Sequence, residues 1–347
     1  MSEELKTRLR AEALALGFAD CRFTAAEAPA HALSFRQWLA EGQAGEMQWL
    51  TRGEAKRCDP QQVLPGAQSL IVLTLNYWQG GASPRERGRV ARYAWGEDYH
   101  ELVERKLRQL DGCLAQHGGR QKWYVDTGPI LERDFAAAAG VGWQGKSTML
   151  VNRRLGAWFF LAEILTTLDL PPDAPQPARC GSCTRCITAC PTGAITQPYR
   201  LDAQRCISYL TIELKGPIPI ELRALIGDRI YGCDDCLEVC PWNRFAAVSR
   251  ESAFASRPAT QMPLRDYLSL DDAQFRVLFR RSAIKRIKRR GFLRNVCVAL
   301  GNIGRPPDLP ALRRAAEDAE PLIAEHARWA IEQIEARAAL APRLGAG

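Results

Sequence analysis

The stretch Cys180-Gly-Ser-Cys183-Thr-Arg-Cys186-Ile-Thr-Ala-Cys190-Pro191 decides the fold around it, because its spacing is typical of thiolates that bind a metal cluster. A second group, Cys233-x2-Cys236-x3-Cys240-Pro241, has a similar spacing with one cysteine fewer. Cys206 stands alone between the two groups and brings the count to eight. The sequence therefore predicts two complete sites of four thiolates each.

The run that ends in Cys190-Pro191 is the one found in bacterial ferredoxins, where three thiolates hold one 4Fe-4S cluster and the fourth reaches another cluster. This crossed pattern predicts one cluster on Cys180, Cys183, Cys186 and Cys240, and the other on Cys190, Cys206, Cys233 and Cys236. The alternative is a pair of zinc ribbons, which use paired Cys-x2-Cys knuckles. The other cysteines lack such spacing, and we expect them to pack as small apolar residues: Cys21, Cys58, Cys113 and Cys297.

Length and composition predict a soluble protein of two or three domains. The chain has 347 residues, of which 46% are hydrophobic and 25% charged, close to globular averages. The first 18 residues mix charged and apolar positions at helical spacing and carry no export signal. We therefore expect a cytoplasmic protein whose reduced thiols bind metal. The net charge of +8 suggests a polyanionic partner.

Residues 1–170 alternate helical and strand-like segments, which predicts an α/β layer. We expect helices near 2–16 and 97–117, and strands near 69–77, 122–125, 148–151 and 157–161. Residues 140–147 match the P-loop pattern G-x4-G-K-[ST]. A P-loop needs a strand before it and a helix after it, whereas here a helix former precedes and a strand-like segment follows. We therefore expect no nucleotide site there.

Asp126 ends the apolar strand Trp123-Tyr-Val and precedes the turn Thr127-Gly-Pro129. Open α/β sheets place ligands at such an edge, and a carboxyl group kept protonated under an apolar cofactor would serve as a general acid. The alternative is that Asp126 only forms an Asx-type turn or a helix cap before Pro129. The sequence leaves both interpretations open.

Residues 276–294 contain nine Arg or Lys and no acid, which is the strongest charge run in the chain. Apolar residues at 275, 278, 279, 284 and 287 predict a helix and a following turn with one apolar and one basic face. Segments 293–302 and 324–333 are typical of paired helices of a HEAT-like repeat, joined through residues 308–310. A merely solvated helix face is the alternative for the basic run.

Four segments together resemble epoxyqueuosine reductases, and their order and spacing match as well: 126–133, 142–147, 206–213 and 231–243. The resemblance implies an enzyme that uses cobalamin, reduced through two 4Fe-4S clusters, to remove the epoxide oxygen of epoxyqueuosine at the wobble position of tRNA. The Cys190 cluster would lie nearer the cobalamin, and Asp126 matches the proton donor of the family. Cobalamin contacts are implied at Arg57, Asp126, Lys146, Leu150, Ser208 and Asp234.

The implied fold class is an α+β multidomain protein. Its domains would be an α/β cobalamin-binding domain (1–170), a ferredoxin-like two-cluster domain (171–250) and a HEAT-like helical module that binds tRNA (251–347). The basic surface would bind anticodon stem-loop phosphates, and the modified base must leave its stack to react. Candidate tRNA contacts are Glu213, Lys215, Lys285, Arg286, Lys288, Arg289, Arg290 and Arg294.

Two other functions remain open at this point. A reductive dehalogenase-like enzyme acting on a small molecule would share the cobalt and the clusters, but it has no reason for the basic tail. An electron-transfer or RNA-binding iron-sulfur protein without catalysis of its own would not bind cobalamin. The resemblance favours a monomeric protein. The cellular protein or molecule that donates electrons to the clusters is unidentified.

Overall fold

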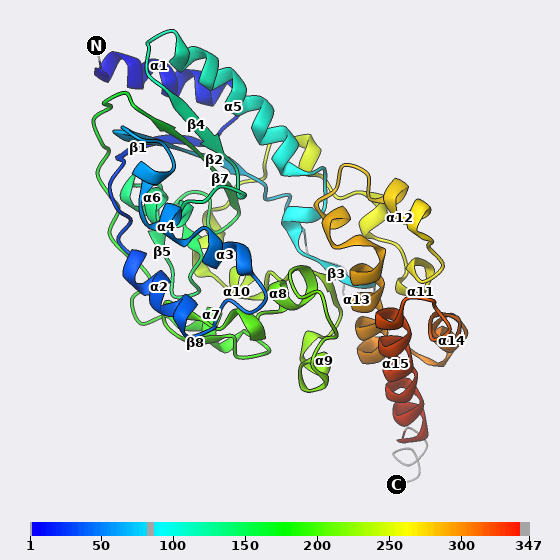
Figure 1. Ribbon diagram of the computed structural model, residues 1–347. Helices are drawn as coiled ribbons and strands as arrows, with labels where there is room; N and C mark the ends of the chain where they lie inside the picture. Colours follow the sequence, from blue (N-terminus) through cyan, green and yellow to red (C-terminus); the bar gives the residue numbers. More distant parts are fainter. Residues whose placement is uncertain (1, 82–86, 341–347) are drawn as a thin grey trace.

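The computed structural model describes residues 2–81 and 87–340 (Figure 1). Its first part is built on a four-stranded sheet of order β1-β2-β7-β4, in which every neighbouring pair is antiparallel. The strands are β1 (Asp20–Ala25), β2 (Ser69–Asn76), β7 (Phe159–Thr166) and β4 (Gln121–Tyr124). The strand expected at 157–161 instead runs from Phe159 to Thr166, because it pairs with the whole length of β2.

Helices cover both faces of this sheet, because successive residues of a strand point to opposite sides. On one face, Leu9 of α1 (Ser2–Ala15) and Leu107 of α5 (Tyr99–Ala115) share a core with Leu73 of β2. On the other face, Phe135 of α6 (Glu132–Ala138) packs in a core with Val72 of β2. The predicted helices near 2–16 and 97–117 are thus confirmed.

The segment that matches a P-loop forms a hairpin. Strand β5 (Trp143–Gln144) pairs antiparallel with β6 (Leu150–Val151), and α6 precedes both. The expected order of helix and then strand is confirmed, although residues 148–151 join β5 and not the main sheet. The helices that lead from β1 to β2 are α2 (Ala32–Ala40), α3 (Gln48–Arg52) and α4 (Glu54–Cys58).

The cysteine-rich region consists of short elements. In chain order they are α7 (Arg185–Thr188), β8 (Ile195–Gln197), β9 (Arg200–Leu201), α8 (Ile207–Ile212), α9 (Ile220–Ile226), β10 (Arg229–Tyr231) and α10 (Asp235–Glu238). Strand β10 pairs in parallel with β3 (Arg89–Val90), which comes from the first part of the chain. This pairing ties the two regions together.

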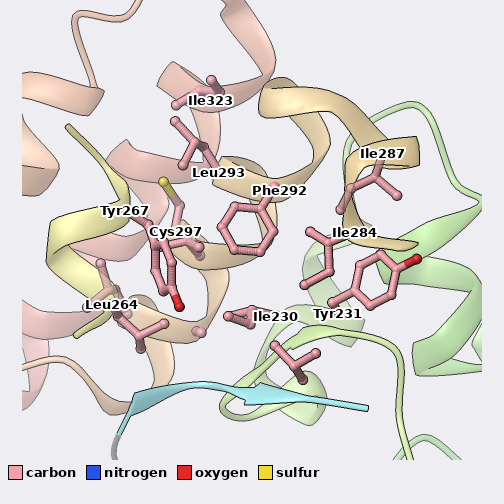
Figure 2. Close-up of a cluster of buried hydrophobic side chains, with 14 of the residues drawn as sticks. Ile230, Tyr231, Leu264, Tyr267, Ile284, Ile287, Phe292, Leu293, Cys297 and Ile323 are labelled. Carbon is pink, nitrogen blue, oxygen red and sulfur yellow. The ribbon is translucent and has the colours of Figure 1, made fainter. Parts of the chain in front are cut away.

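The C-terminal helices are α11 (Leu264–Tyr267), α12 (Asp272–Leu278), α13 (Lys288–Ile303), α14 (Leu309–Ala315) and α15 (Pro321–Leu340). Figure 2 shows their core around Phe292, with Tyr267 and Ile323 from neighbouring helices and Ile230 from β10. The module therefore shares one core with the cysteine-rich region. Helices α13 and α15 contain the two predicted segments, while the HEAT-like classification stays a prediction. Within the described residues, no helix combines the length and apolar character of a membrane span.

The basic run 276–294 does not form the continuous helix and turn that we expected. It covers the end of α12, a break at Arg281 with φ of 57°, a 3-10 helix at Ala283–Ile287 and the start of α13 at Lys288, where φ is 59°. The break occurs because the apolar residues Phe279, Ile284 and Ile287 all turn into one core, which a single straight helix would not allow. The basic residues consequently point in several directions.

Candidate active site and cluster sites

The first group of predicted ligands surrounds one cavity. Cys180, Cys183 and Cys186 precede or begin α7, and Cys240 follows α10, yet all four line the same space of about 220 Å³. Helices α7 and α10 are in contact, so residues more than 50 positions apart meet here. The structure thus brings together the four cysteines that the crossed pattern assigns to one cluster.

The second group also converges. Burial raises the pKa of the Cys236 thiol well above its usual range, and the neighbouring thiols of Cys233, Cys206 and Cys190 raise it further. Burial likewise raises the pKa of Cys206, which stands at the start of α8. A thiol raised in this way becomes a thiolate only beside a compensating positive charge such as a metal. The raised pKa values of Cys206, Cys233 and Cys236, with Cys190 beside them, therefore favour a metal-binding role.

The spacing of the thiols favours clusters over zinc. Across residues 2–81 and 87–340, no three His, Cys, Asp or Glu side chains converge on a position for a single ion. A zinc ribbon gathers four ligands around one point, whereas a 4Fe-4S cluster binds each thiolate at a separate iron. The cavity inside the first group fits the second arrangement. Among the other cysteines, Cys21, Cys58 and Cys297 are buried as predicted, whereas Cys113 is partly exposed.

Asp126 lies directly after β4 with φ of 59°, a left-handed conformation uncommon outside glycine. Its carboxylate Oδ2 is 3.4 Å from Nε2 of His100, and Tyr99 lies close enough for its hydroxyl to interact with the charge of Asp126. On the other side of the ring, Nδ1 of His100 is 2.7 Å from Oδ1 of Asp98. The side chain of Asp126 is 50% exposed, so it faces both this network and solvent.

The network changes which group holds the proton. Burial would raise the pKa of Asp126, but the hydrogen bond and the charge of His100 lower it below its usual value. Burial would lower the pKa of His100, but its bonds to Asp126 and Asp98 raise it to about 9. At neutral pH the pair therefore carries its proton on His100, not on Asp126 as the sequence suggested. The helix-cap alternative is wrong for α6, because its N-cap residue is Leu131.

Two acidic side chains, Glu163 and Glu132, lie close together inside the sheet, behind Asp126. Glu163, at the middle of β7 between Val72 and Tyr124, is 0% exposed and contacts Glu132 of α6. Burial raises the pKa of Glu163 well above its usual value and that of Glu132 to about 7, and the negative charge of Asp126 raises both further. Two ionised carboxylates cannot donate to each other, so the pair holds at least one proton at neutral pH.

Arg57 connects α4 to the Asp126 loop. Its Nη1 donates to the carbonyl oxygens of Gly128 at 3.0 Å and Ile130 at 3.1 Å, and its guanidinium lies 5.1 Å from the ring centre of Trp49. Burial lowers its pKa, and the negative charges of Glu132 and Asp126 oppose that shift. Arg57 and Asp126 are therefore neighbours.

The remaining cobalamin candidates occupy different surroundings. Ser208 is half-buried on α8 near Cys206, and Asp234 is buried beside Cys233, with its Oδ2 accepting the backbone N–H of Arg92 at 2.7 Å. Burial raises the pKa of Asp234 to about 7. Two further candidates lie elsewhere, Leu150 in the core under α6 and Lys146 at the edge of the first thiolate cavity. All six cobalamin contacts, those of Arg57 and Asp126 included, stay predictions.

The structure removes Arg294 from the predicted tRNA contacts. Its side chain is 1% exposed and donates to the backbone oxygens of Leu210, Leu214 and Gly216 at 2.7–2.8 Å. The guanidinium N–H groups of Arg294 all point into the protein, because α13 packs against the end of α8 there. An arginine in this position holds two elements together and has no free N–H group for a phosphate.

The other basic candidates differ in whether their side chains are exposed and whether they form ion pairs. Arg289 is half-buried and ion-paired with Asp318, so it too holds the module together. Exposed candidates in ion pairs are Arg286 with Glu213 at 2.8 Å and Arg290 with Glu320 at 3.4 Å. Lys215, Lys285 and Lys288 are exposed, and within the described chain none of the three has an acidic ion-pair partner. Arg286 is also close enough to Asp126 for their charges to interact.

Sequence reasoning missed three residues around Asp126. His100 belongs to no sequence motif that would indicate a role, because its contact with Asp126 joins the start of α5 to the end of β4. Glu132 was part of a quoted segment but received no role. Glu163 did carry a signal, since a lone acid inside the apolar stretch 155–165 has to be paired or protonated when buried.

Comparisons with known proteins agree along the whole chain. Residues 57–127 match the family model "Epoxyqueuosine reductase QueG, DUF1730", and residues 179–243 match "4Fe-4S double cluster binding domain". Proteins named epoxyqueuosine reductase from Salmonella typhimurium and Escherichia coli K12 are 42% and 40% identical. Each match covers 96% of this chain, with 90% and 91% of the relative.

Solved structures give the same result. An epoxyqueuosine reductase bound to an epoxyqueuosine-modified tRNA-Tyr stem loop is 33% identical, with a TM-score of 0.90 over 96% of this chain and 91% of that one. The enzyme from Bacillus subtilis, in a state with its catalytic aspartate loop swung out of the active site, is 31% identical with a TM-score of 0.86. The match covers 96% of this chain and 91% of the Bacillus subtilis chain.

Proposed function

This chain belongs to the epoxyqueuosine reductase family, and we propose that it reduces the epoxide of epoxyqueuosine at the tRNA wobble position to give queuosine. The proposal includes a bound cobalamin, two 4Fe-4S clusters on the eight cysteines and Asp126 as proton donor. A tRNA substrate also implies a cytoplasmic protein. The dehalogenase-like alternative is not favoured, because the relatives named epoxyqueuosine reductase match through the C-terminal helices as well.

One observation carries this proposal, namely a continuous line of contacts from the second thiolate group to Asp126. Cys236 and Asp234 lie close enough to Tyr77 for their charges to affect it. The ring centre of Tyr77 is 4.5 Å from that of Phe160, which stacks on Tyr99 at 4.0 Å, and Tyr99 lies close enough to Asp126 to interact with its charge. An electron-carrying site and an acid are thus built into one region.

The residues around Asp126 fit cobalamin, whose corrin edge carries amide groups that both donate and accept hydrogen bonds. Within the described residues, Nε of Arg57 is buried without a hydrogen-bond partner. A buried unpaired donor is costly unless a ligand satisfies it. Arg57 and Asp126, with Ser208 and Asp234 near the second cluster, would hold the cofactor. Bound cobalamin supplies a reduced cobalt centre that delivers electrons to the epoxide.

The side chains supply the protons. Converting an epoxide to an alkene and water consumes two electrons and two protons, and an alkoxide released in a dry pocket needs immediate protonation. Asp126 donates to the epoxide oxygen after taking the proton that His100 holds at neutral pH. Asp98, on the far side of the imidazole, keeps the ring oriented. The buried Glu132 and Glu163 pair lies next in line as a second proton store.

The tRNA would lie across the seam between the cysteine-rich region and the C-terminal helices. Lys285, Lys288 and Arg290 are exposed there and fit phosphate contacts. Arg286 and Glu213 form an ion pair near Asp126, so they fit the entry of the flipped-out nucleotide. We place the cobalamin, cluster and tRNA-binding domains at 1–170, 171–250 and 251–347, in a protein that acts as a monomer.

The test is anaerobic incubation of the reconstituted protein with cobalamin, a reductant and epoxyqueuosine-containing tRNA, followed by nucleoside mass analysis. Queuosine should form, and a nucleoside that keeps its epoxide oxygen would refute the function. Asp126→Asn should retain cluster and corrin absorbance but lose turnover. Asparagine tolerates the left-handed conformation of residue 126, so the backbone is preserved. Unchanged turnover in this variant would remove Asp126 from the proton-donor role.

A further inference from the structure

Four basic side chains line the cavity of the first thiolate group, and none of the described residues that line it is acidic. These residues, called here the cationic rim, are Lys146, Arg179, Arg185 and Arg244. They come from three separate parts of the chain, the hairpin after β5, the loop and start of α7, and the segment after α10. The fold therefore collects positive charge at the mouth of this site.

The charge of the rim is not neutralised by neighbours. Arg179, Arg185 and Arg244 are exposed, and within residues 2–81 and 87–340 none of the three forms an ion pair. The nearby acids of α10 are already paired, Asp235 with Arg229 and Glu238 with Arg92. Residues 174–201, which supply five of the sixteen residues that line the cavity, contain no Asp or Glu. A net positive field therefore extends from the cavity into solvent.

Aromatic side chains border the same opening. Trp242 lines the cavity two residues after Cys240, and Phe245 is 45% exposed with the Arg244 guanidinium 4.6 Å from its ring centre. Exposed aromatics beside arginine are typical of protein-protein contact surfaces. A patch for small ions alone would not need them.

The rim also lies apart from the proposed tRNA surface. Figure 1 shows α7 apart from α13, the helix that Lys288 and Arg290 begin, with α8 and α9 drawn between them. The contacts that lead to Asp126 start from the second thiolate group, at Cys236. Cys236 lines the first cavity too, so the two thiolate groups adjoin. The first group is thus the outer one of the two.

We infer that the cationic rim docks an acidic one-electron carrier protein, which reduces the cluster of the first thiolate group. The inference rests on the proposed function, because it needs clusters that carry electrons. In each encounter the carrier loses one electron and the cluster gains one, with no bond made or broken. Two such transfers supply the two electrons of one epoxide reduction. Complementary charge favours rapid, weak association, which suits a carrier that must leave again.

The test uses the reconstituted holoprotein and a reduced, acidic plant-type [2Fe-2S] ferredoxin as the probe. The variant Arg179→Glu/Arg185→Glu/Arg244→Glu leaves Lys146 and all cysteines in place. Its second-order rate of cluster reduction at low salt should fall roughly 10- to 100-fold, and the rate should lose its steep dependence on ionic strength. The affinity for oxidised ferredoxin, measured by calorimetry without turnover, should fall in parallel.

Controls separate this inference from the function itself. Photoreduced 5-deazariboflavin is uncharged, so it should reduce both proteins equally and support queuosine formation by both. Arg8→Glu/Arg105→Glu changes exposed arginines on α1 and α5 and should leave the ferredoxin rate intact. An unchanged ferredoxin rate in the rim variant overturns the docking inference, and it does so whether or not tRNA affinity falls. A protein that makes no queuosine even with deazariboflavin contradicts the proposed function instead.

Discussion

Replacing Arg294 with methionine should destabilise the protein and leave its electrostatic affinity for tRNA unchanged. The guanidinium donates to three carbonyl oxygens at the end of α8, those of Leu210, Leu214 and Gly216, and also to Oδ1 of Asn295. Carbonyls at a helix end have no partner within the helix. Methionine fills a similar volume but offers them no donor.

The size of the effect follows from burial. Each buried acceptor left without a donor costs about 1–3 kcal/mol, and breaking a buried charged network costs about 3–5 kcal/mol in total. Part of this loss is offset, because burial already lowers the pKa of Arg294 to about 10, a sign that the charge is held at some expense. We therefore expect about 3 kcal/mol of destabilisation. At about 2–4 °C per kcal/mol, the thermal midpoint should fall by about 6–12 °C.

Two measurements on the holoprotein decide the matter, the thermal midpoint and the salt dependence of stem-loop affinity. Arg294→Met should lower the midpoint and keep the slope of log affinity against log salt. Lys285→Met is the matched control, because Lys285 is exposed, and it should keep the midpoint and reduce the slope by about 0.7–0.9. If Arg294→Met instead reduces the slope and unfolds like the parent, the assignment of Arg294 to the interior is wrong.

Two further predictions concern the buried core. The folded-state pKa of Glu163 lies above its unfolded value, so the contribution of Glu163 to stability is lost as pH rises above about 4.3. In Glu163→Gln, the thermal midpoint should therefore depend less on pH between pH 5 and 8 than it does in the parent protein. A parent-like pH slope in that variant would contradict the shared proton with Glu132. Phe292→Ala should lower stability by about 3–5 kcal/mol in urea unfolding, because this ring is 0% exposed and packs against Tyr267, Phe275 and Phe279. A loss under 1 kcal/mol would mean that the core repacks around the missing ring.

Local patterns predicted the elements whose cause is local. Strand β2 was expected at 69–77 and lies at Ser69–Asn76, since six apolar and β-branched residues in a row favour a buried strand. The helix before the false P-loop was placed correctly for the same reason. The extent of β7 was not, because its ends depend on pairing with β2, which lies about 90 residues away in the chain.

Charge patterns were less informative, because a basic run does not say which way each side chain points. Arg290 and Arg294 are one helical turn apart on α13 and looked equivalent in sequence. Arg290 is exposed and pairs with Glu320, whereas Arg294 passes beneath α8. The difference arises from where a neighbouring helix ends, and no local pattern contains that information.

The sequence by itself determined the eight cysteines with ligand spacing and the family, because ligand chemistry demands particular residues at particular spacings, and it left the role of Asp126 open. Only the tertiary structure decided which cysteines share a cavity wall, that His100 holds the proton beside Asp126, and that Glu132 and Glu163 meet inside the sheet. The protonation state of a group depends on its burial and on the charges around it. Those neighbours are set by contacts between residues far apart in the chain, so they exist only after folding.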